Sequence, residues 1–477
     1  MSFVKTAAER GIIPEAHSSV AHSHLVGFKN MVTHLIQNKQ LPENGLCEAE
    51  IRHLLTELAL SDSNNFPGKV GAGEREGRVI SRLVQDRHFN LTHGIGRSGN
   101  IRDPQPKAAG SSIICQVTDG LALDATRAAG IKGLKSALVL PMATGMALRE
   151  SFIALLHMRP NAKHVIWPRI DQKSCLKSML SLNLTVHPIE PLLQDRELVT
   201  NLEAIENKIR ELGDKNILCI HSTISCFAPR RPDKITDIGK ISYQRDIPHI
   251  VNGAYFLTIK KARNLVQECA QSKGRSRIDA VVCSTDKNFL TPVGGSIIFS
   301  ASKGEDAITT KIAKNYPGRA SMSPVLDLFI TLLEIGKSGS YMRLIKGQED
   351  NFDLLVSELE KFGNERKMEV LGYNGVSVAI SLERFSCTKD GDNKHLVELG
   401  SRLFRRNISG PRVVPCDGKN EKKISCHNFK NYGSSYDAYP QPYLALASAI
   451  GMERREIEIL MKKLANVIDA AIRDFCK

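Results

Sequence analysis

One lysine between two short apolar runs is the residue of this chain best suited to covalent chemistry. Lys287 lies in the polar segment 284–289, between the β-branched pairs at 281–282 and 297–298, and an upstream apolar run ends at Asn252. A pyridoxal-phosphate site needs this pattern: the lysine bonds to the cofactor aldehyde, and the earlier polar side chain reaches the pyridine nitrogen. A surface lysine in a polar turn fits the segment equally well.

Two further strand ends carry residues suited to the same cofactor. Ala143, Thr144 and Gly145 follow an apolar run and open a helix, where free N–H groups can bind a phosphate. An ordinary helix cap at Thr144 is compatible with that prediction. Gln172 belongs to a dense polar run after Trp167, and polar residues gather at the carboxyl ends of parallel strands because the ligand crevice lies there.

A glycine-rich loop, 94–107, is a candidate phosphate site. Residues 94–99 fit G-x-G-x-x-G, but no apolar strand precedes them, and Pro104 and Pro106 fall where the helix should open, which argues against a dinucleotide site. The remaining polar groups could hold a phosphate, with a solvated loop as the alternative. They are Arg97, Ser98, Arg102, Gln105 and Lys107.

A second glycine-rich segment, 71–78, mixes both charges. Arg75 and Arg78 could bind anions, whereas Glu74 and Glu76 do not suit a simple anion site. The two glutamates therefore require a separate explanation.

The pattern of apolar runs predicts an α/β protein with a mainly parallel central sheet. Residues 1–60 are predicted to be helical, with an apolar face that includes Leu25, Phe28 and Leu35, and 61–112 to be largely irregular. We expect three segments: a helical extension (1–60), a catalytic domain (61–324) and a small α+β domain (325–477). The expected strands are 137–141, 164–167, 185–189, 217–221, 249–251, 280–283, 296–299, 376–380 and 412–414.

Composition narrows the class of protein and its partners. A chain of 477 residues is expected to have several domains. Its net charge of +14 predicts an acidic partner, and nucleic acid is the first candidate for that partner. The eleven cysteines show no metal-ligand spacing, the first residues lack the apolar stretch typical of a signal peptide, and no apolar window is long enough for a membrane span. We therefore expect a cytoplasmic protein without a metal site.

Together these segments resemble the O-phosphoseryl-tRNA:selenocysteinyl-tRNA synthase family over residues 60–450, with a poor match at 416–439. The motifs that carry the resemblance are long and specific. They are SDSNNF, GEREGRV, HGIGRSGN, QPKAAGSS, PMATGM, WPRIDQKS, CIHSTISCFAPR, DKNF with PVGG, YPGRAS and PRVVP.

The resemblance implies a fold-type-I pyridoxal-phosphate enzyme and a homotetramer, in which the N-terminal helices serve assembly and the tRNA acceptor arm. It implies that phosphoseryl-tRNA(Sec) is converted to selenocysteinyl-tRNA(Sec), with selenophosphate as donor. Lys287 would bond the cofactor, and Glu74 would repel the carboxylate of free phosphoserine. The other implied sites are cofactor contacts at Arg75, Ala143, Thr144, Gly145, Gln172 and Asn252, a substrate-phosphate pocket of Arg97, Ser98, Gln105 and Arg319, and tRNA contacts at Lys39, Arg275 and Arg412.

Rival functions differ in what they need. A lyase that makes cysteine on tRNA uses a similar site, and a desulfurase needs an exposed cysteine on a mobile loop. A tRNA-binding scaffold would have lost the lysine, whereas Lys287 is present with its arginines.

Overall fold

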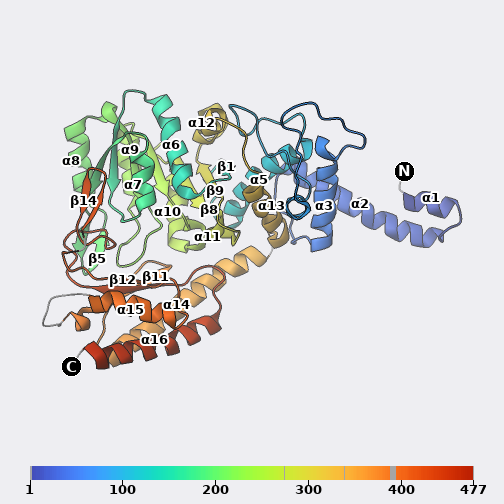
Figure 1. Ribbon diagram of the computed structural model, residues 1–477. Helices are drawn as coiled ribbons and strands as arrows, with labels where there is room; N and C mark the ends of the chain where they lie inside the picture. Colours follow the sequence, from blue (N-terminus) through green and yellow to red (C-terminus); the bar gives the residue numbers. More distant parts are fainter. Residues whose placement is uncertain (1–2, 273, 338, 387–393, 420, 476–477) are drawn as a thin grey trace. The chain divides into compact units, whose positions relative to one another are not determined.

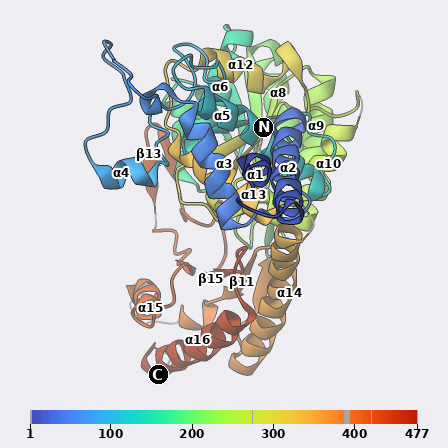
Figure 2. The same cartoon turned by 90° about the vertical axis from the view of Figure 1, so that its right-hand side faces the viewer.

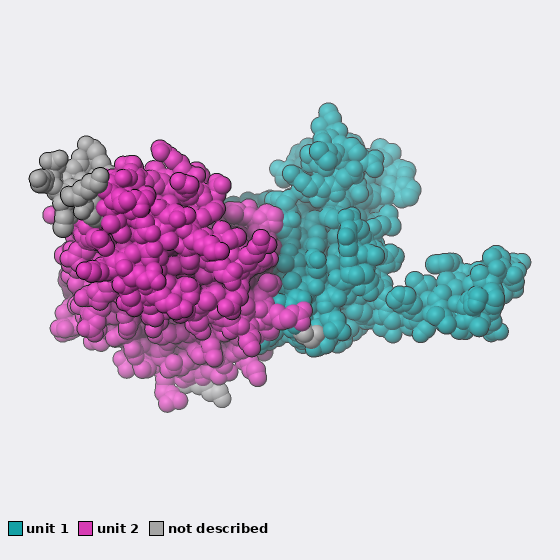
Figure 3. Space-filling model, turned by 90° about the horizontal axis from the view of Figure 1, so that it is seen from below, with its two compact units in different colours: residues 1–128, 316–341 teal, residues 129–315, 342–477 magenta. Residues whose placement is uncertain are grey.

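The computed structural model describes residues 3–272, 274–337, 339–386, 394–419 and 421–475 (Figure 1). The chain divides into two compact units, each described separately below (Figure 3). Unit 1 comprises residues 1–128 and 316–341, and unit 2 comprises 129–315 and 342–477. The three segments expected from the sequence were divided by their expected functions, and that division remains a proposal.

Unit 1 is helical, with a long irregular stretch after its third helix. Its helices are α1 (Phe3–Glu9), α2 (Glu15–Asn38), α3 (Glu48–Leu60), α4 (Arg82–Arg87), α5 (Ala109–Ala128) and α13 (Ser323–Ile335). Helices α3, α5 and α13 pack together (Figure 2). Close packing requires glycine in α5, because a Cβ at Gly110 would lie 1.9 Å from the carbonyl oxygen of Leu58.

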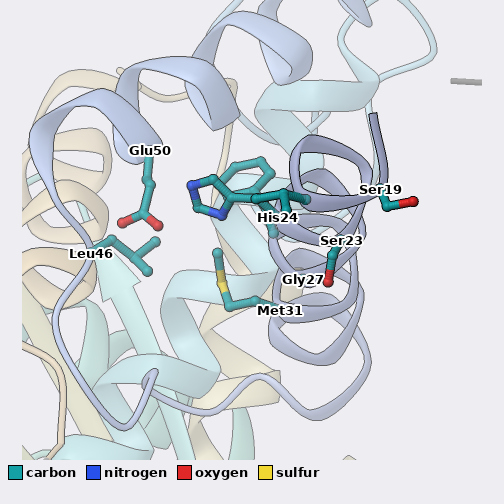
Figure 4. A pocket seen from close by; sticks show the side chains of 9 residues that line it. Ser19, Ser23, His24, Gly27, Met31, Leu46 and Glu50 are labelled. Atoms are coloured by element: carbon teal, nitrogen blue, oxygen red, sulfur yellow. The ribbon is translucent and has the colours of Figure 1, made fainter. Parts of the chain in front are cut away.

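The apolar face expected on α2 is largely uncovered within unit 1. Leu35 is 3% exposed, but Leu25 is 41% exposed. A cavity of about 730 Å³ lies beside α2. In Figure 4, His24 and Met31 of α2 face Leu46 and Glu50 across it. The prediction of a helix is confirmed, but its apolar side is not the core of this unit.

Unit 2 contains the predicted central sheet, with strand order β1-β9-β8-β7-β6-β2-β3. β9 runs antiparallel to both of its neighbours, and the other pairings are parallel. The mainly parallel sheet is therefore confirmed. Its strands are β1 (Ser136–Leu140), β2 (His164–Pro168), β3 (Thr185–Ile189), β6 (Ile217–Thr223), β7 (His249–Asn252), β8 (Ala280–Ser284) and β9 (Ser296–Ser300).

Helices on this sheet form two packed groups. α6 packs with α7 and α12, while α9 packs with α8 and α10. Their bounds are α6 (Thr144–Met158), α7 (Lys173–Leu180), α8 (Leu202–Leu212), α9 (Ile235–Gln244), α10 (Lys260–Gln271), α11 (Thr285–Phe289) and α12 (Ile308–Asn315). The central strands β6, β7, β8 and β9 are buried along their whole length, as strands covered on both faces should be, whereas the edge strand β3 is partly exposed.

The carboxyl-terminal part of unit 2 is a small antiparallel sheet with three helices. Its strand order is β10-β11-β15-β12, and the predicted strands β11 and β12 are confirmed. The elements are β10 (Val370–Tyr373), β11 (Ser377–Ser381), β12 (Arg412–Val414), β15 (Tyr443–Ala447), α14 (Ser340–Arg366), α15 (Lys394–Arg405) and α16 (Arg454–Phe475).

Two short hairpins in unit 2 were not expected from the sequence. They pair β4 (Leu192–Gln194) with β5 (Glu197–Val199), and β13 (Lys422–Ile424) with β14 (His427–Phe429). Among the described residues, no helix combines the length and the apolar character that a membrane crossing needs.

Candidate active site

Lys287 lies on the one-turn helix α11 that joins β8 to β9. Its Nζ is 3.3 Å from Ser284 Oγ and 3.4 Å from Asp286 Oδ2. The side chain is 49% exposed. The buried Asn288 holds this turn, since its amide accepts from the Leu257 backbone and donates to the Ala254 carbonyl. The expected turn is thus a helix fixed between two paired strands.

Asn252 ends β7 and joins three strand ends. Its buried Nδ2 donates to Gln172 Oε1 at 3.1 Å and approaches Cys175 Sγ at 3.1 Å. Gln172 in turn donates to the Ser225 carbonyl at 3.3 Å. In the described part of the chain, Asn252 Oδ1 is buried without a partner. An unpartnered buried acceptor at a strand end suits a bound ligand.

The start of α6 contributes a hydroxyl to the same place. Thr144 Oγ1 lies 2.6 Å from Ser284 Oγ, so it links α6 to the strand end before Lys287. The residue at the cap position is Ala143, which makes no side-chain cap. The hydroxyl of Thr144 therefore does not serve as the ordinary cap considered above.

A cavity of about 450 Å³ in unit 2 brings together five of the predicted site residues, Thr144, Gln172, Asn252, Lys287 and Arg412. It is lined by Thr144, Leu148, Asp171, Gln172, Lys173, Ser174, Cys175, Phe227, Asn252, Ala254, Tyr255, Lys287, Arg412 and Tyr432. The guanidinium of Arg412 stacks over the Phe227 ring at 4.5 Å. Ala143 and Gly145 adjoin Thr144 but do not line the cavity.

Sequence reasoning missed part of this lining. Phe227 stands in the motif CIHSTISCFAPR just beyond β6, which was a usable signal. Tyr255 follows Asn252 by three residues, and Cys175 lies one turn into the polar run after β2. Tyr432 lies in the poorly matching segment 416–439, and no pattern in the sequence pointed to it.

In unit 1, the backbone joins the glycine-rich loop to the segment that carries Arg319. Ile95 and Ala320 exchange two backbone hydrogen bonds, of 3.0 and 3.1 Å. The Arg319 guanidinium donates to the His93 carbonyl, and Gln105 Nε2 is 3.5 Å from the Gly96 carbonyl. The loop and Arg319, predicted to share a phosphate pocket, are therefore neighbours within one unit.

The cations of this loop divide into two groups. Arg102 pairs with Asp119 at 2.8 Å, and Lys107 pairs with Glu76 at 2.5 Å. Arg97 is exposed, and within the described residues its side chain makes no hydrogen bond or ion pair. Ser98 beside it is exposed as well. The paired cations shape the loop, whereas Arg97 is available to a ligand.

The two glutamates of segment 71–78 also differ. Glu76 is buried between Lys69, at 3.1 Å, and Lys107. Hydrogen bonds from Lys107 and then Lys69 lower the pKa of its carboxyl to about 2. Glu74 is exposed, and its carboxylate lies 3.8 Å from Arg75 Nε. Glu76 is structural, whereas Glu74 and Arg75 project into solvent.

The remaining predicted tRNA contacts are not part of either cluster. Lys39 follows α2 in a left-handed conformation, with φ of 51°, and its stem packs against Gly120 of α5. Arg275 is exposed in the turn after α10. Both remain predictions.

Comparison with known proteins identifies the family of this chain. A family profile described as O-phosphoseryl-tRNA(Sec) selenium transferase, SepSecS, matches residues 61–469. The transferase of that name from Dictyostelium discoideum is 41% identical over 96% of this chain and 98% of its own length. That from Methanocaldococcus jannaschii is 33% identical over 96% and 99%.

A solved structure shows the same relationship. The crystal structure of archaeal O-phosphoseryl-tRNA(Sec) selenium transferase has a TM-score of 0.84 and 29% identity, and the match covers 96% of this chain and 98% of that one. The expected fold-type-I architecture is confirmed by this match. This chain belongs to the O-phosphoseryl-tRNA(Sec) selenium transferase family.

Proposed function

We propose that this protein converts O-phosphoseryl-tRNA(Sec) to selenocysteinyl-tRNA(Sec), with selenophosphate as the selenium donor. Membership of the transferase family supports the reaction. The structural observation that supports it is the cavity in which Lys287, Asn252 and Thr144 converge from three strand ends. A lysine placed in this way serves as a covalent anchor and as a base.

Pyridoxal phosphate fits the residues of this cavity. Lys287 would hold its aldehyde carbon, the start of α6 at Thr144 its phosphate, and Asn252 its ring nitrogen, with Gln172 steadying Asn252. Arg75 of unit 1 stays a proposed contact that rests on family resemblance. When bound, the cofactor supplies an electron sink that weakens the bonds at the substrate's α-carbon.

Different side chains of the protein would carry out proton transfer and phosphate binding. Lys287 Nζ accepts the proton from the α-carbon, with Ser284 and Asp286 within 3.4 Å to orient it. As the bond between Cβ and the phosphate oxygen breaks, Arg97, Ser98, Gln105 and Arg319 would receive the leaving phosphate. The selenium of selenophosphate then adds to Cβ, Lys287 returns the proton to the α-carbon, and water cleaves the Se–P bond with release of a second phosphate. Phosphate is a good leaving group and hydroxide is a poor one. A pocket that binds phosphate therefore selects the phosphorylated substrate, from which elimination is easier.

The desulfurase alternative needs a reactive cysteine beside the lysine, and this cavity lacks one among its lining residues. Cys175 is the cysteine that lines it, and burial raises the pKa of that thiol to about 12. The thiol is therefore protonated at neutral pH and is a poor nucleophile.

Partners and assembly belong to the same proposal. The net charge of +14 favours binding of tRNA, with Lys39, Arg275 and Arg412 as contacts. A homotetramer would cover the apolar side of α2 that unit 1 leaves exposed. A cytoplasmic location is proposed as well.

The deciding experiment is turnover of phosphoseryl-tRNA(Sec) with selenophosphate and pyridoxal phosphate. Formation of selenocysteinyl-tRNA is expected, and free phosphoserine serves as the negative control. Binding of tRNA without any turnover would favour the scaffold alternative. Product formed with sulfide but not with selenophosphate would favour the lyase that makes cysteine on tRNA.

A further inference from the structure

A buried arginine and aspartate just after β2 tie a distant loop to the wall of the lysine cavity. Asp171 is only 2% exposed in its side chain. Its Oδ2 accepts from the backbone N–H of Gly433 at 2.7 Å and of Ser435 at 2.8 Å. Its own N–H donates to Ser435 Oγ at 3.0 Å. One side chain thus holds two amides more than 260 residues away along the chain, with separations of 262 and 264.

Arg169 reinforces the same attachment from the other side. Its fully buried guanidinium pairs with Asp171 at 2.9 Å and with Asp437 at 2.5 Å. It also donates to the Lys430 carbonyl at 3.0 Å and lies over the Phe429 ring at 4.7 Å. The segment 430–437, called here the latch loop, is therefore held at both ends.

The latch loop carries Tyr432 into the cavity lining. Gly433 has φ of 115°, a conformation that favours glycine, and it directs the chain so that its N–H meets Asp171. Tyr432 lies next to this turn and lines the cavity together with Lys287 and Arg412. Burial and then the nearby charge of Asp171 raise the pKa of the Tyr432 hydroxyl to about 12, so it stays neutral.

We propose that Asp171 is a positioning residue for the active site: by holding the Gly433 and Ser435 amides, it fixes Tyr432 as the cavity wall that orients the aminoacyl end of the substrate. Gln172, the next residue, bonds Asn252, so the same turn supports both the cofactor side and the substrate side of the cavity. This inference rests on the proposed function.

The chain supplies a matched control for the aspartate. Asp279 stands in a second Arg-Ile-Asp sequence, where it pairs with Arg277 at 2.9 Å and accepts from the His249 N–H at 2.8 Å. It lies before β8, beside the first residue of β7, and so at the amino edge of the parallel strands, away from the cavity. Asp171→Asn and Asp279→Asn thus make the same chemical change at opposite edges of one sheet.

The test compares these two variants with Tyr432→Ala and Tyr432→Phe. An amide has one acceptor oxygen and cannot satisfy all the donors around Asp171, so Asp171→Asn should speed hydrogen exchange in the latch loop. Its kcat/KM for phosphoseryl-tRNA should fall about ten- to a hundredfold, as a misplaced wall predicts. Tyr432→Ala should reproduce the kinetic loss without the faster exchange, and Tyr432→Phe should keep most activity.

Two readouts separate positioning from general stability. The Kd for pyridoxal phosphate, titrated by absorbance without tRNA, should change less than about threefold in Asp171→Asn, because Asp171 is not among the residues proposed to hold the cofactor and those residues keep their side chains. Asp279→Asn should lower Tm but leave kcat/KM near wild type. Unchanged kcat/KM in Asp171→Asn despite faster loop exchange, or equal kinetic losses in both aspartate variants, would overturn the inference. Wild-type turnover is measured first, so failure of the proposed function would be seen in the unsubstituted protein.

Discussion

The lysine cavity of unit 2 and the glycine-rich loop of unit 1 differ in whether their polar side chains are already bonded to other groups of the protein. Around Lys287 the polar groups already bind one another: Thr144 meets Ser284, and Asn252 meets Gln172. In the loop, Arg97 stays exposed, while Arg102 is bound to Asp119. Strand ends can hold side chains before a ligand arrives, whereas in the described part of the chain the loop leaves Arg97, the cation proposed to bind the phosphate, without a side-chain partner.

Removal of the lysine should have the largest effect on turnover of all the substitutions in these two regions. Lys287→Ala should abolish turnover, by at least about 10³-fold, because both the covalent link and the proton transfer need that amine. The cofactor's absorption, on the order of 400–430 nm, should be lost as well. Tm should change little, since the side chain is half exposed. Substantial residual turnover would remove Lys287 from this role.

In the loop, the paired and unpaired cations should separate function from stability. Arg97→Ala, Gln105→Ala and Arg319→Ala should each cost about 1.5–3 kcal/mol in transition-state binding of the phosphorylated substrate. Steady-state kinetics measure this loss. Arg102→Ala is the control and should instead lower stability, because it removes the ion pair between Arg102 and Asp119. Wild-type activity in all three of the first variants would exclude the loop as the phosphate pocket.

Arg412 tests whether the cavity also reads RNA. The family resemblance implies that Arg412 lies near the tRNA discriminator base, so we predict that Arg412→Ala weakens discrimination at that base by about 1–3 kcal/mol. Loss of a phosphate contact would instead weaken all tRNAs alike and reduce the salt dependence. The measurement is kcat/KM for discriminator-base variants with both proteins. Equal losses for every base would make Arg412 a backbone contact.

The low pKa of Glu76 predicts that the stabilisation contributed by this side chain depends on pH. Its pKa is about 2, below the ordinary 4.5, because of Lys107 and Lys69. A lowered carboxyl pKa means that its stabilising effect is complete above pH 4.5 and is lost as the pH falls toward 2. The difference in unfolding free energy between wild type and Glu76→Gln should follow that course in urea titrations. A difference that is constant down to pH 2 would contradict it.

Glu74 should give the smallest effect. Glu74→Gln removes the charge expected to repel the carboxylate of free phosphoserine, so a low rate with that compound should appear. Turnover of phosphoseryl-tRNA should stay near wild type, because the side chain is exposed and not part of the packing. The assay is phosphate release from free phosphoserine. No release above the wild-type background would refute the filter.

Whether a region could be predicted from the sequence depends on whether local patterns or tertiary contacts determine its structure. The seven strands of the central sheet were predictable because they form short, mainly apolar runs, and those at the centre of the sheet are buried throughout. Lys287 and Asn252 follow from those strands, since their ends share one edge of the sheet. The hairpin β13–β14 is short and polar, so periodicity could not show it. Nor could any local pattern reveal that Asp171 holds Gly433, because the contact depends on tertiary folding alone.

The pairing of Ile95 with Ala320 has a consequence for the order in which the protein is made. Arg319 lies 226 residues after His93, its partner across this pairing. A ribosome that adds about 5–20 residues per second needs about 11–45 s to cover that distance. Strands β1 to β9, which end at Ser300, are complete before Arg319 is synthesised. A nascent chain therefore has the strands around the lysine before it can build the proposed phosphate pocket.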